Sequence, residues 1–186
     1  GDARSSAAAP SLHSARVEAL RSTTKVAPCP RLPSPDRAES AADPHGRLPD
    51  VTLPCLGKGP EVRLAAIAGR PAVLNIWAQW CSPCRKEAPL FQALHARAGD
   101  RVLVLGVDYD DPRPDWALRL AGQLDLRYPQ VVDADKRLKA PFAMAVGVPG
   151  TVFVAADGRV VHITHRVYQS GPDLARDVRT YLGVGA

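Results

Sequence analysis

No apolar run in the sequence approaches the roughly 20 residues that a membrane span requires. Runs of basic residues and basic stripes interleaved with aromatics are also lacking, so the net charge of +5 does not indicate a nucleic-acid-binding protein. There is no internal repeat, which argues against a repeat architecture. What remains is a chain of 186 residues, 46% of them hydrophobic, which is enough for one domain with a sizeable core.

The first fifty residues contain no Phe, Tyr or Trp, but they contain seven prolines. Because such a segment cannot bury much apolar surface, we expect residues 1–49 to be mostly extended or mobile. The stretch "SLHSARVEALR", with Ser11 as its candidate cap, makes a short helix near residues 11–22 the one candidate element here. The chain begins with GDARSS, without a methionine or a signal-like apolar core, so we expect a trimmed piece whose export signal or anchor lies outside it.

From Asp50 onward the composition changes, and the pattern predicts a single α/β domain over residues 50–186. Continuous apolar runs at 71–78 and 101–109 are typical of strands buried on both faces. Two β-rich runs joined by Asp157 and a glycine predict a hairpin. Helices are expected from the cysteine pair to about Arg97, from Pro114 onward with Trp116, Leu120 and Leu124 at i, i+4 and i+8, and from Gly171 toward the C-terminus. This order implies a central mixed sheet with helices on both faces.

Two of the four cysteines have motif spacing, in the stretch "NIWAQWCSPCRKEAP". Pro83 lacks an N–H, so it indicates that a helix begins at the cysteines. At a helix N-terminus the free N–H groups and the dipole stabilise a thiolate, and Arg85 and Lys86 add positive charge nearby. Because the thiolate is the nucleophile in disulfide exchange, the motif predicts that Cys81, the more exposed of the two, attacks the substrate and that Cys84 resolves the mixed disulfide.

Other uses of this cysteine pair are less well supported by the sequence. A zinc site would need a second CxxC or a suitably spaced histidine pair, and neither is present. A purely structural disulfide would close too small a loop to constrain the unfolded chain. Two thiols on a helix tip can hold Cu(I), although the single methionine, Met144, is expected in the core rather than at such a site.

The stretch "LNIWAQWCSPCRKEAP", followed roughly sixty residues later by "GVPGTVFVAADGRVV", resembles the thioredoxin superfamily. Within it, the chain is similar to the extracytoplasmic, membrane-anchored thiol–disulfide oxidoreductases of the cytochrome c maturation (TlpA/ResA-like) type. The likeness covers about residues 50–184. It implies a thioredoxin-like fold preceded by an extended N-terminal segment, a monomer, and catalysis by a CxxC pair without a cofactor or a metal.

The resemblance also implies roles for residues outside the cysteine pair. Val148 and Pro149 match the cis-proline site of the family, where the exposed backbone of Val148 would pair with an extended substrate segment. Trp80 would join them in substrate binding. Glu87 matches an acid that could take and return the proton of Cys84, and the alternative is an ordinary surface charge. Asn75 stands where cytoplasmic thioredoxins carry a buried aspartate, which leaves Glu87 as the candidate.

The remaining cysteines, Cys29 and Cys55, are both flanked by proline and lie far apart in the chain. We expect them to form a disulfide that ties the N-terminal segment to the domain, and the alternative is two free thiols. A second disulfide would favour an oxidising compartment.

Together these expectations predict an extracytoplasmic thiol–disulfide oxidoreductase that reduces or exchanges disulfides in exported proteins, for example in cytochrome c maturation. Its partners would be those thiol- or disulfide-containing proteins and a membrane redox partner. Two alternatives stay open, a disulfide-forming oxidant for secreted proteins and a Cu(I)-binding carrier. A thioredoxin-like peroxidase is disfavoured because that class places its reactive cysteine in a different motif.

Overall fold

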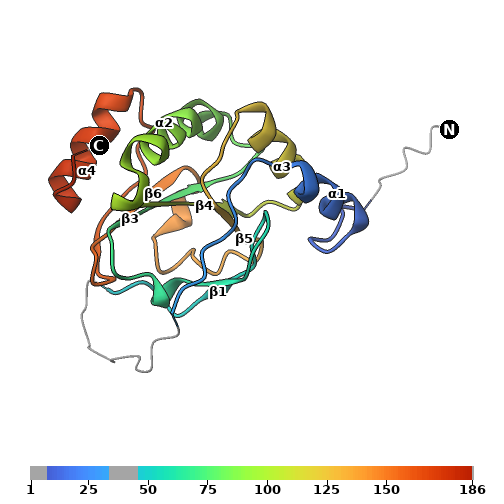
Figure 1. The fold of residues 1–186 in the computed structure, drawn as a ribbon, viewed down its shortest axis with the longest axis horizontal. Helices are drawn as coiled ribbons and strands as arrows, with labels where there is room; N and C mark the ends of the chain where they lie inside the picture. Colours follow the sequence, from blue (N-terminus) through green and yellow to red (C-terminus); the bar gives the residue numbers. More distant parts are fainter. Residues whose placement is uncertain (1–7, 34–45, 186) are drawn as a thin grey trace.

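The computed structural model describes residues 8–33 and 46–185. Its centre is a five-stranded sheet with the strand order β5-β4-β3-β6-β7 (Figure 1). The strands are β3 (Ala72–Trp77), β4 (Leu103–Tyr109), β5 (Gln130–Asp133), β6 (Gly150–Val154) and β7 (Val160–Thr164). β3, β4 and β5 run parallel, whereas β6 and β7 are antiparallel additions. The expected central mixed sheet is therefore confirmed.

Three helices cover one face of this sheet (Figure 1). They are α2 (Ser82–Ala98), α3 (Pro114–Gln123) and α4 (Gly171–Leu182). Phe91 of α2 and Leu174 of α4 pack in one buried cluster with Phe153 of the sheet. Across residues 8–33 and 46–185, no helix combines the length and the apolar character needed to cross a membrane.

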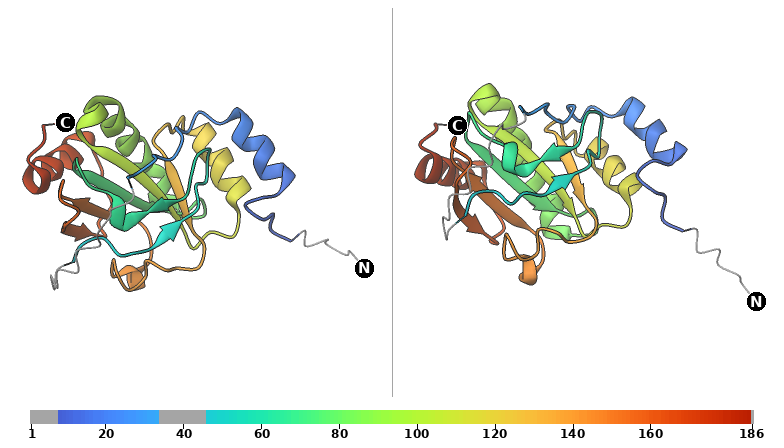
Figure 2. Two further views of the ribbon diagram at one scale, coloured as in Figure 1. Left: turned by 60° about the horizontal axis from the view of Figure 1, so that its bottom comes forward. Right: turned by 90° about the horizontal axis from the view of Figure 1, so that it is seen from below.

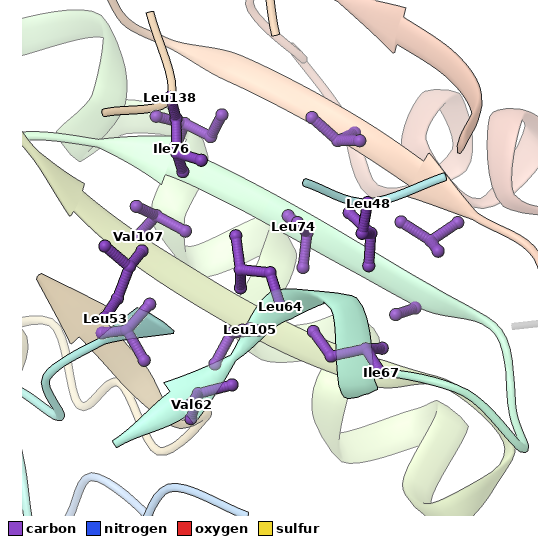
Figure 3. Close-up of a cluster of buried hydrophobic side chains, with 14 of the residues drawn as sticks. Leu48, Leu53, Val62, Leu64, Ile67, Leu74, Ile76, Leu105, Val107 and Leu138 are labelled. Carbon is purple, nitrogen blue, oxygen red and sulfur yellow. The ribbon is translucent and has the colours of Figure 1, made fainter. Parts of the chain in front are cut away.

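The other face is covered without long helices. The hairpin of β1 (Thr52–Leu53) and β2 (Val62–Arg63) lies across it, together with the 3-10 turns η1 (Leu64–Ala66) and η3 (Met144–Val146) (Figure 2). Figure 3 shows the aliphatic core between these segments and the sheet. It includes Leu64, Leu74, Ile76, Leu105 and Leu138. Met144 is buried in this cluster, so its expected core position is confirmed. The helices expected on this face are thus replaced, in the described residues, by short turns.

Two sequence-based expectations around β5 need correction. The four-residue strand itself was not predicted, because a run this short between a proline and acidic residues carries little periodic signal. The helix expected from Pro114 is present, but the row of Trp116, Leu120 and Leu124 does not form its buried face. Trp116 is 45% exposed, under the Arg113 guanidinium, which lies 4.1 Å from the ring centroid. The apolar residues that α3 buries after its first turn are Ala117, Leu118 and Ala121.

The N-terminal segment packs on the domain where it is described. Helix α1 (Ala15–Thr23) lies beside α3 (Figure 2). Val17 is fully buried, in one cluster with Ala117 and Leu118 of α3 and Val132 of β5. Its cap is Ser14, whose Oγ accepts a hydrogen bond from Val17 N, rather than Ser11. The expectation that this segment buries little apolar surface is therefore wrong for residues 8–33. Residues 1–7 and 34–45 of it lie outside the described part, and a boundary near residue 50 stays a prediction.

A disulfide joins Cys29 to Cys55, with a Cα–Cα distance of 6.0 Å and a sequence separation of 26. Gly59 makes room for it, because a Cβ there would lie 2.8 Å from the backbone N of Cys29. Closing a loop of this length is worth about 3–4 kcal/mol in the chain-entropy model. The bond therefore holds the N-terminal segment on the β1–β2 side of the domain.

One glycine at the centre of the sheet has a clear packing reason. Gly106 pairs with Asn75 on one side and Gln130 on the other. A Cβ on Gly106 would overlap the side-chain amide of Gln130. The missing side chain lets that amide lie across β4 and accept a hydrogen bond from Trp77 Nε1 at 2.8 Å.

We therefore predict that Gly106→Ala lowers the free energy of unfolding by about 1–3 kcal/mol, since the new methyl group must displace a buried amide. Urea unfolding checks the loss, and near-ultraviolet circular dichroism reports the changed setting of Trp77. Gly122→Ala is the matched control, because a Cβ there meets nothing within 4 Å and alanine favours its helix. Equal stability of Gly106→Ala and the parent protein would contradict this packing argument.

Candidate active site

The cysteine motif lies where β3 leads into α2. Cys81 is the N-cap residue of α2, and Pro83 occupies the first turn, as predicted from the sequence. Cys81 Sγ accepts a hydrogen bond from Cys84 N at 3.3 Å. This N–H is one of the free donors at the helix start, so it points at the atom that would carry a thiolate charge.

Cys81 and Cys84 form a disulfide in this structure, with a Cα–Cα distance of 5.3 Å. Cys81 is 5% exposed and Cys84 is 1% exposed. The expectation that Cys81 is the more exposed of the two is therefore confirmed, although both cysteines are buried in the disulfide form. The exposed residue is Trp80, at 50%, and its Nε1 donates a hydrogen bond to Asp110 O at 3.0 Å.

An apolar cluster surrounds the cysteine pair, and we call it the active-site cluster. Its members are Val17, Leu56, Trp77, Ala78, Cys81, Cys84, Ala117, Leu118 and Val132. Val148 packs against it, and the Val148–Pro149 peptide bond is cis. The structure thus brings together the cysteine pair and the expected Val148 and Pro149 segment, which lie more than 60 residues apart in the chain.

Glu87 is fully buried, which excludes its reading as a surface charge. It lies three residues after Cys84 on α2, a spacing that places both side chains on one helix face. Its Oε1 accepts a hydrogen bond from Asn75 Nδ2 at 3.4 Å, and its Oε2 accepts one from Tyr168 N at 3.0 Å. Burial raises the pKa of Glu87 to about 7, and the two hydrogen bonds offset only part of that effect.

The surroundings of Glu87 include groups that the sequence did not indicate. Tyr128 OH donates a hydrogen bond to Asn75 Oδ1 at 2.9 Å, which fixes the orientation of the Asn75 amide toward Glu87. Burial raises the pKa of Tyr128, so this hydroxyl stays a donor. Tyr128 and Tyr168 are distant from Glu87 in sequence, and no local pattern could have revealed their contacts.

A second set of hydrogen bonds fixes the segment just before the cysteines. The carboxylate of Asp111 accepts hydrogen bonds from Gln79 N at 3.0 Å and from Gln79 Nε2 at 3.4 Å. It also accepts one from Arg113 N at 2.9 Å. The turn after β4 therefore holds the residues that lead into Cys81. In the described ranges, no three His, Cys, Asp or Glu side chains gather to form a candidate metal site.

Comparisons with known proteins agree with this geometry. The model of the AhpC/TSA family matches residues 44–163. The chain is 36% identical over 126 residues to the thiol:disulfide interchange protein CycY of Rhizobium leguminosarum bv. viciae, covering 67% of this chain and 60% of that protein. It is 26% identical over 106 residues to the thiol–disulfide oxidoreductase ResA of Bacillus anthracis, covering 56% of this chain and 60% of ResA. The chain therefore spans about 60% of the length of these curated relatives.

Solved structures show the same fold. A secreted Mycobacterium tuberculosis disulfide oxidoreductase, homologous to DsbE of E. coli, superposes with a TM-score of 0.61 at 25% identity, covering 70% of this chain and 96% of that one. A secreted thiol–disulfide isomerase from Corynebacterium glutamicum gives a TM-score of 0.64 at 25% identity, covering 83% and 96%. The thioredoxin-like fold expected from the sequence is confirmed.

The buried Glu87 predicts a specific pH dependence of stability. Between pH 4.5 and about 7 the unfolded chain releases this proton while the folded protein keeps it, so the folded state loses stability as the pH rises. Relative to Glu87→Gln, the parent protein in its disulfide form should therefore lose about 3 kcal/mol across this window and stay level above it.

Urea unfolding at a series of pH values measures this difference. Glu61→Gln, at an exposed position, is the matched control and should follow the parent profile. Parallel stability profiles for Glu87→Gln and the parent protein would show that the carboxyl group of Glu87 titrates normally.

Proposed function

The chain belongs to the AhpC/TSA family, and we propose that it is an extracytoplasmic thiol–disulfide oxidoreductase that works through Cys81 and Cys84. The observation that carries this proposal is the cysteine pair at the N-terminus of α2, with a backbone N–H directed at Cys81 Sγ. The names of CycY and ResA, both thiol–disulfide proteins, support it.

The reaction starts from the reduced pair. The Cys81 thiolate attacks one sulfur of a substrate disulfide, which breaks the substrate S–S bond, forms a mixed disulfide and releases the first substrate sulfur as a thiolate. Cys84, once deprotonated, attacks Cys81 Sγ and releases the second substrate sulfur. Two electrons have then passed to the substrate, and the protein is left with the disulfide seen in this structure.

Glu87 is the group we propose for the proton of Cys84. A general base works best when its pKa lies near the operating pH, and burial raises the pKa of Glu87 to about 7. The amide of Asn75 and the backbone N–H of Tyr168 hold the carboxyl group in place. Asn75 cannot itself take a proton, so it acts as a positioning residue.

Trp80, Val148 and Pro149 are the proposed contacts for a substrate segment. Trp80 offers a half-exposed ring next to Cys81, and Val148 packs against the active-site cluster. Val146 is also exposed. Large apolar side chains exposed around a reactive pair are typical of a surface that accepts another polypeptide.

The proposed setting is the cell envelope, with membrane anchoring outside this chain. The Cys29–Cys55 disulfide supports an oxidising compartment. Two structural neighbours are described as secreted, and the name of one of them cites DsbE. A role in cytochrome c maturation, with exported thiol- or disulfide-containing proteins as substrates and a membrane redox partner, is the specific form of the proposal suggested by the family resemblance.

We predict that Cys84→Ser accumulates mixed disulfides between Cys81 and substrate proteins, because the resolving sulfur is gone. Cys81→Ser should abolish disulfide reductase activity and trap nothing. Non-reducing gels and an insulin reduction assay measure both effects. Stoichiometric Cu(I) binding without exchange activity would instead indicate a carrier.

The direction of electron flow follows from how well the reduced pair is stabilised. Cys81 lies in an apolar cluster with one N–H donor, while Arg85 and Lys86 are exposed on the outer side of α2. The N–H of Cys84 stabilises a thiolate at Cys81, but the apolar cluster and the exposed positions of Arg85 and Lys86 make that stabilisation smaller than the sequence suggested. Modest stabilisation of the thiolate favours the disulfide and makes the dithiol a reductant. Equilibration with glutathione buffers should therefore give a potential nearer to about −270 mV than to about −120 mV. A value near the upper figure would indicate a disulfide-forming oxidant.

A further inference from the structure

A second buried acid lies close to the cysteine pair and has no part in the proposed reaction. Asp108 is fully buried near the end of β4. Its register partners are Trp77 on β3 and Val132 on β5, and both belong to the active-site cluster. Residues directly opposite one another on adjacent strands share a face of the sheet. Asp108 therefore lies on the same face as the cysteines, among their apolar neighbours.

The carboxyl group of Asp108 lacks the donors that an anion would need. Within the described part of the chain, neither oxygen accepts a hydrogen bond. An ionised carboxylate in such a place would be costly, because burial removes its hydration and nothing replaces it. Burial first, and then the charge and hydrogen bond of Asp111, raise the pKa of Asp108 well above its ordinary range. A buried carboxyl group without donors is most stable in its neutral form, which leaves Asp108 with an O–H to donate.

Asp111 has the opposite environment. It is also buried, but its carboxylate accepts two hydrogen bonds from Gln79 and one from the backbone of Arg113. Among the residues that the structure describes, Asp108 has no such donors. Gln79 lies two residues before Cys81, and Trp80 is bound to the backbone of Asp110 in the same turn. The acid pair is thus connected directly to the segment that carries the reactive sulfur.

We propose that Asp108 and Asp111 share one proton and act together as a positioning pair that fixes Gln79 and Trp80 in front of Cys81. Asp108 donates the shared proton to Asp111. Asp111 in turn accepts two hydrogen bonds from Gln79 and one from Arg113 N, and these bonds hold Gln79 in place. Losing the proton places two negative charges side by side in the core, which drives Asp111 toward solvent and releases Gln79. The inference deepens the proposed function, because it names what holds the exposed ring of Trp80 beside the cysteine pair.

The other charged groups around this end of β4 are already satisfied. Asp115 on α3 pairs with Arg113 at 2.7 Å and with Arg16 at 3.2 Å. Asp133 on β5 accepts hydrogen bonds from the backbone of residues 137 and 138. From α2, the two cysteines do not titrate as a disulfide, and the buried carboxyl group of Glu87 is held by Asn75 and the backbone of Tyr168. Lys136 pairs with Asp110 at 3.9 Å. Because Glu87 also titrates in the disulfide form, the Asp108→Asn variant is what assigns a pH-dependent step to the shared proton.

Carbon-13 labelling of aspartate carboxyl groups tests the shared proton directly. At about pH 7, well above the ordinary aspartate pKa of about 3.9, one labelled carboxyl group should still give the signal of a protonated acid. Asp108→Asn should remove that one signal. Asp125→Asn, at an exposed aspartate, is the matched control and should leave it in place. A spectrum in which every aspartate of the parent protein is ionised at this pH would overturn the proposal.

The positioning role has its own readout, which needs no exchange activity. In the disulfide form of a Trp116→Phe background, acrylamide quenching reports mainly on Trp80, because Trp77 is buried. As the pH is raised, loss of the shared proton should produce a step of increased quenching. Asp108→Asn keeps a donor for Asp111 that does not ionise, so the step should be absent. The same step in both proteins would overturn the positioning role.

Because both measurements use the oxidised protein, they separate this inference from the proposed function. A protein that passes both tests but reduces no disulfide would refute the oxidoreductase and leave the positioning pair intact. An active enzyme that lacks the labelled signal or the quenching step would refute the positioning pair and leave the oxidoreductase intact.

Discussion

The carboxyl group of Glu87 is fully buried, and the residues around the site supply its hydrogen bonds. Its two hydrogen bonds come from different parts of the chain, the side chain of Asn75 on β3 and the backbone of Tyr168 before α4. Tyr128 in turn fixes the Asn75 amide. A buried acid with so few donors keeps a high pKa only while these elements stay packed. Strand β3, helix α2 and the approach to α4 are therefore coupled through one side chain.

The two faces of the sheet differ in character: one is lined by aliphatic side chains, and the other carries the buried polar groups near the site. The face toward the β1–β2 hairpin is lined by aliphatic side chains such as Leu74, Ile76 and Leu105 (Figure 3). The face toward the helices carries the buried polar groups, among them Asn75, Asp108, Gln130 and Thr151. Alternation along the strands places these polar residues on the side of the sheet that α2, α3 and α4 cover. Burying them costs free energy that the apolar face offsets, which is how the site can hold acids with displaced pKa values.

The sequence predicted those parts of this arrangement that depend on local signals. The apolar runs located β3 and β4, and Pro83 located the start of α2, because backbone chemistry alone decides these features. The positions of Cys81, Cys84 and Glu87 followed from a motif. The contacts of Tyr128, Tyr168 and Asp111 could not be predicted, since they arise when segments far apart in sequence pack together. Trp116 was grouped with Leu120 and Leu124 by its helical spacing, but it is half exposed and the Arg113 guanidinium stacks on its ring at the surface.

The N-terminal segment was expected to be tied to the domain by a disulfide and otherwise mostly extended or mobile, yet its contacts lead to the active site. Arg21 of α1 donates a hydrogen bond from Nε to Leu56 O at 2.9 Å, and Leu56 N donates to Gln130 O at 2.9 Å. Cys55, held by the disulfide to Cys29, forms a bridge with Val131 next to Gln130. The Gln130 side chain then crosses β4 to hold Trp77, a member of the active-site cluster. Because each link is a hydrogen bond or a covalent bond between buried groups, loosening α1 would weaken the support of Trp77 without touching either reactive cysteine.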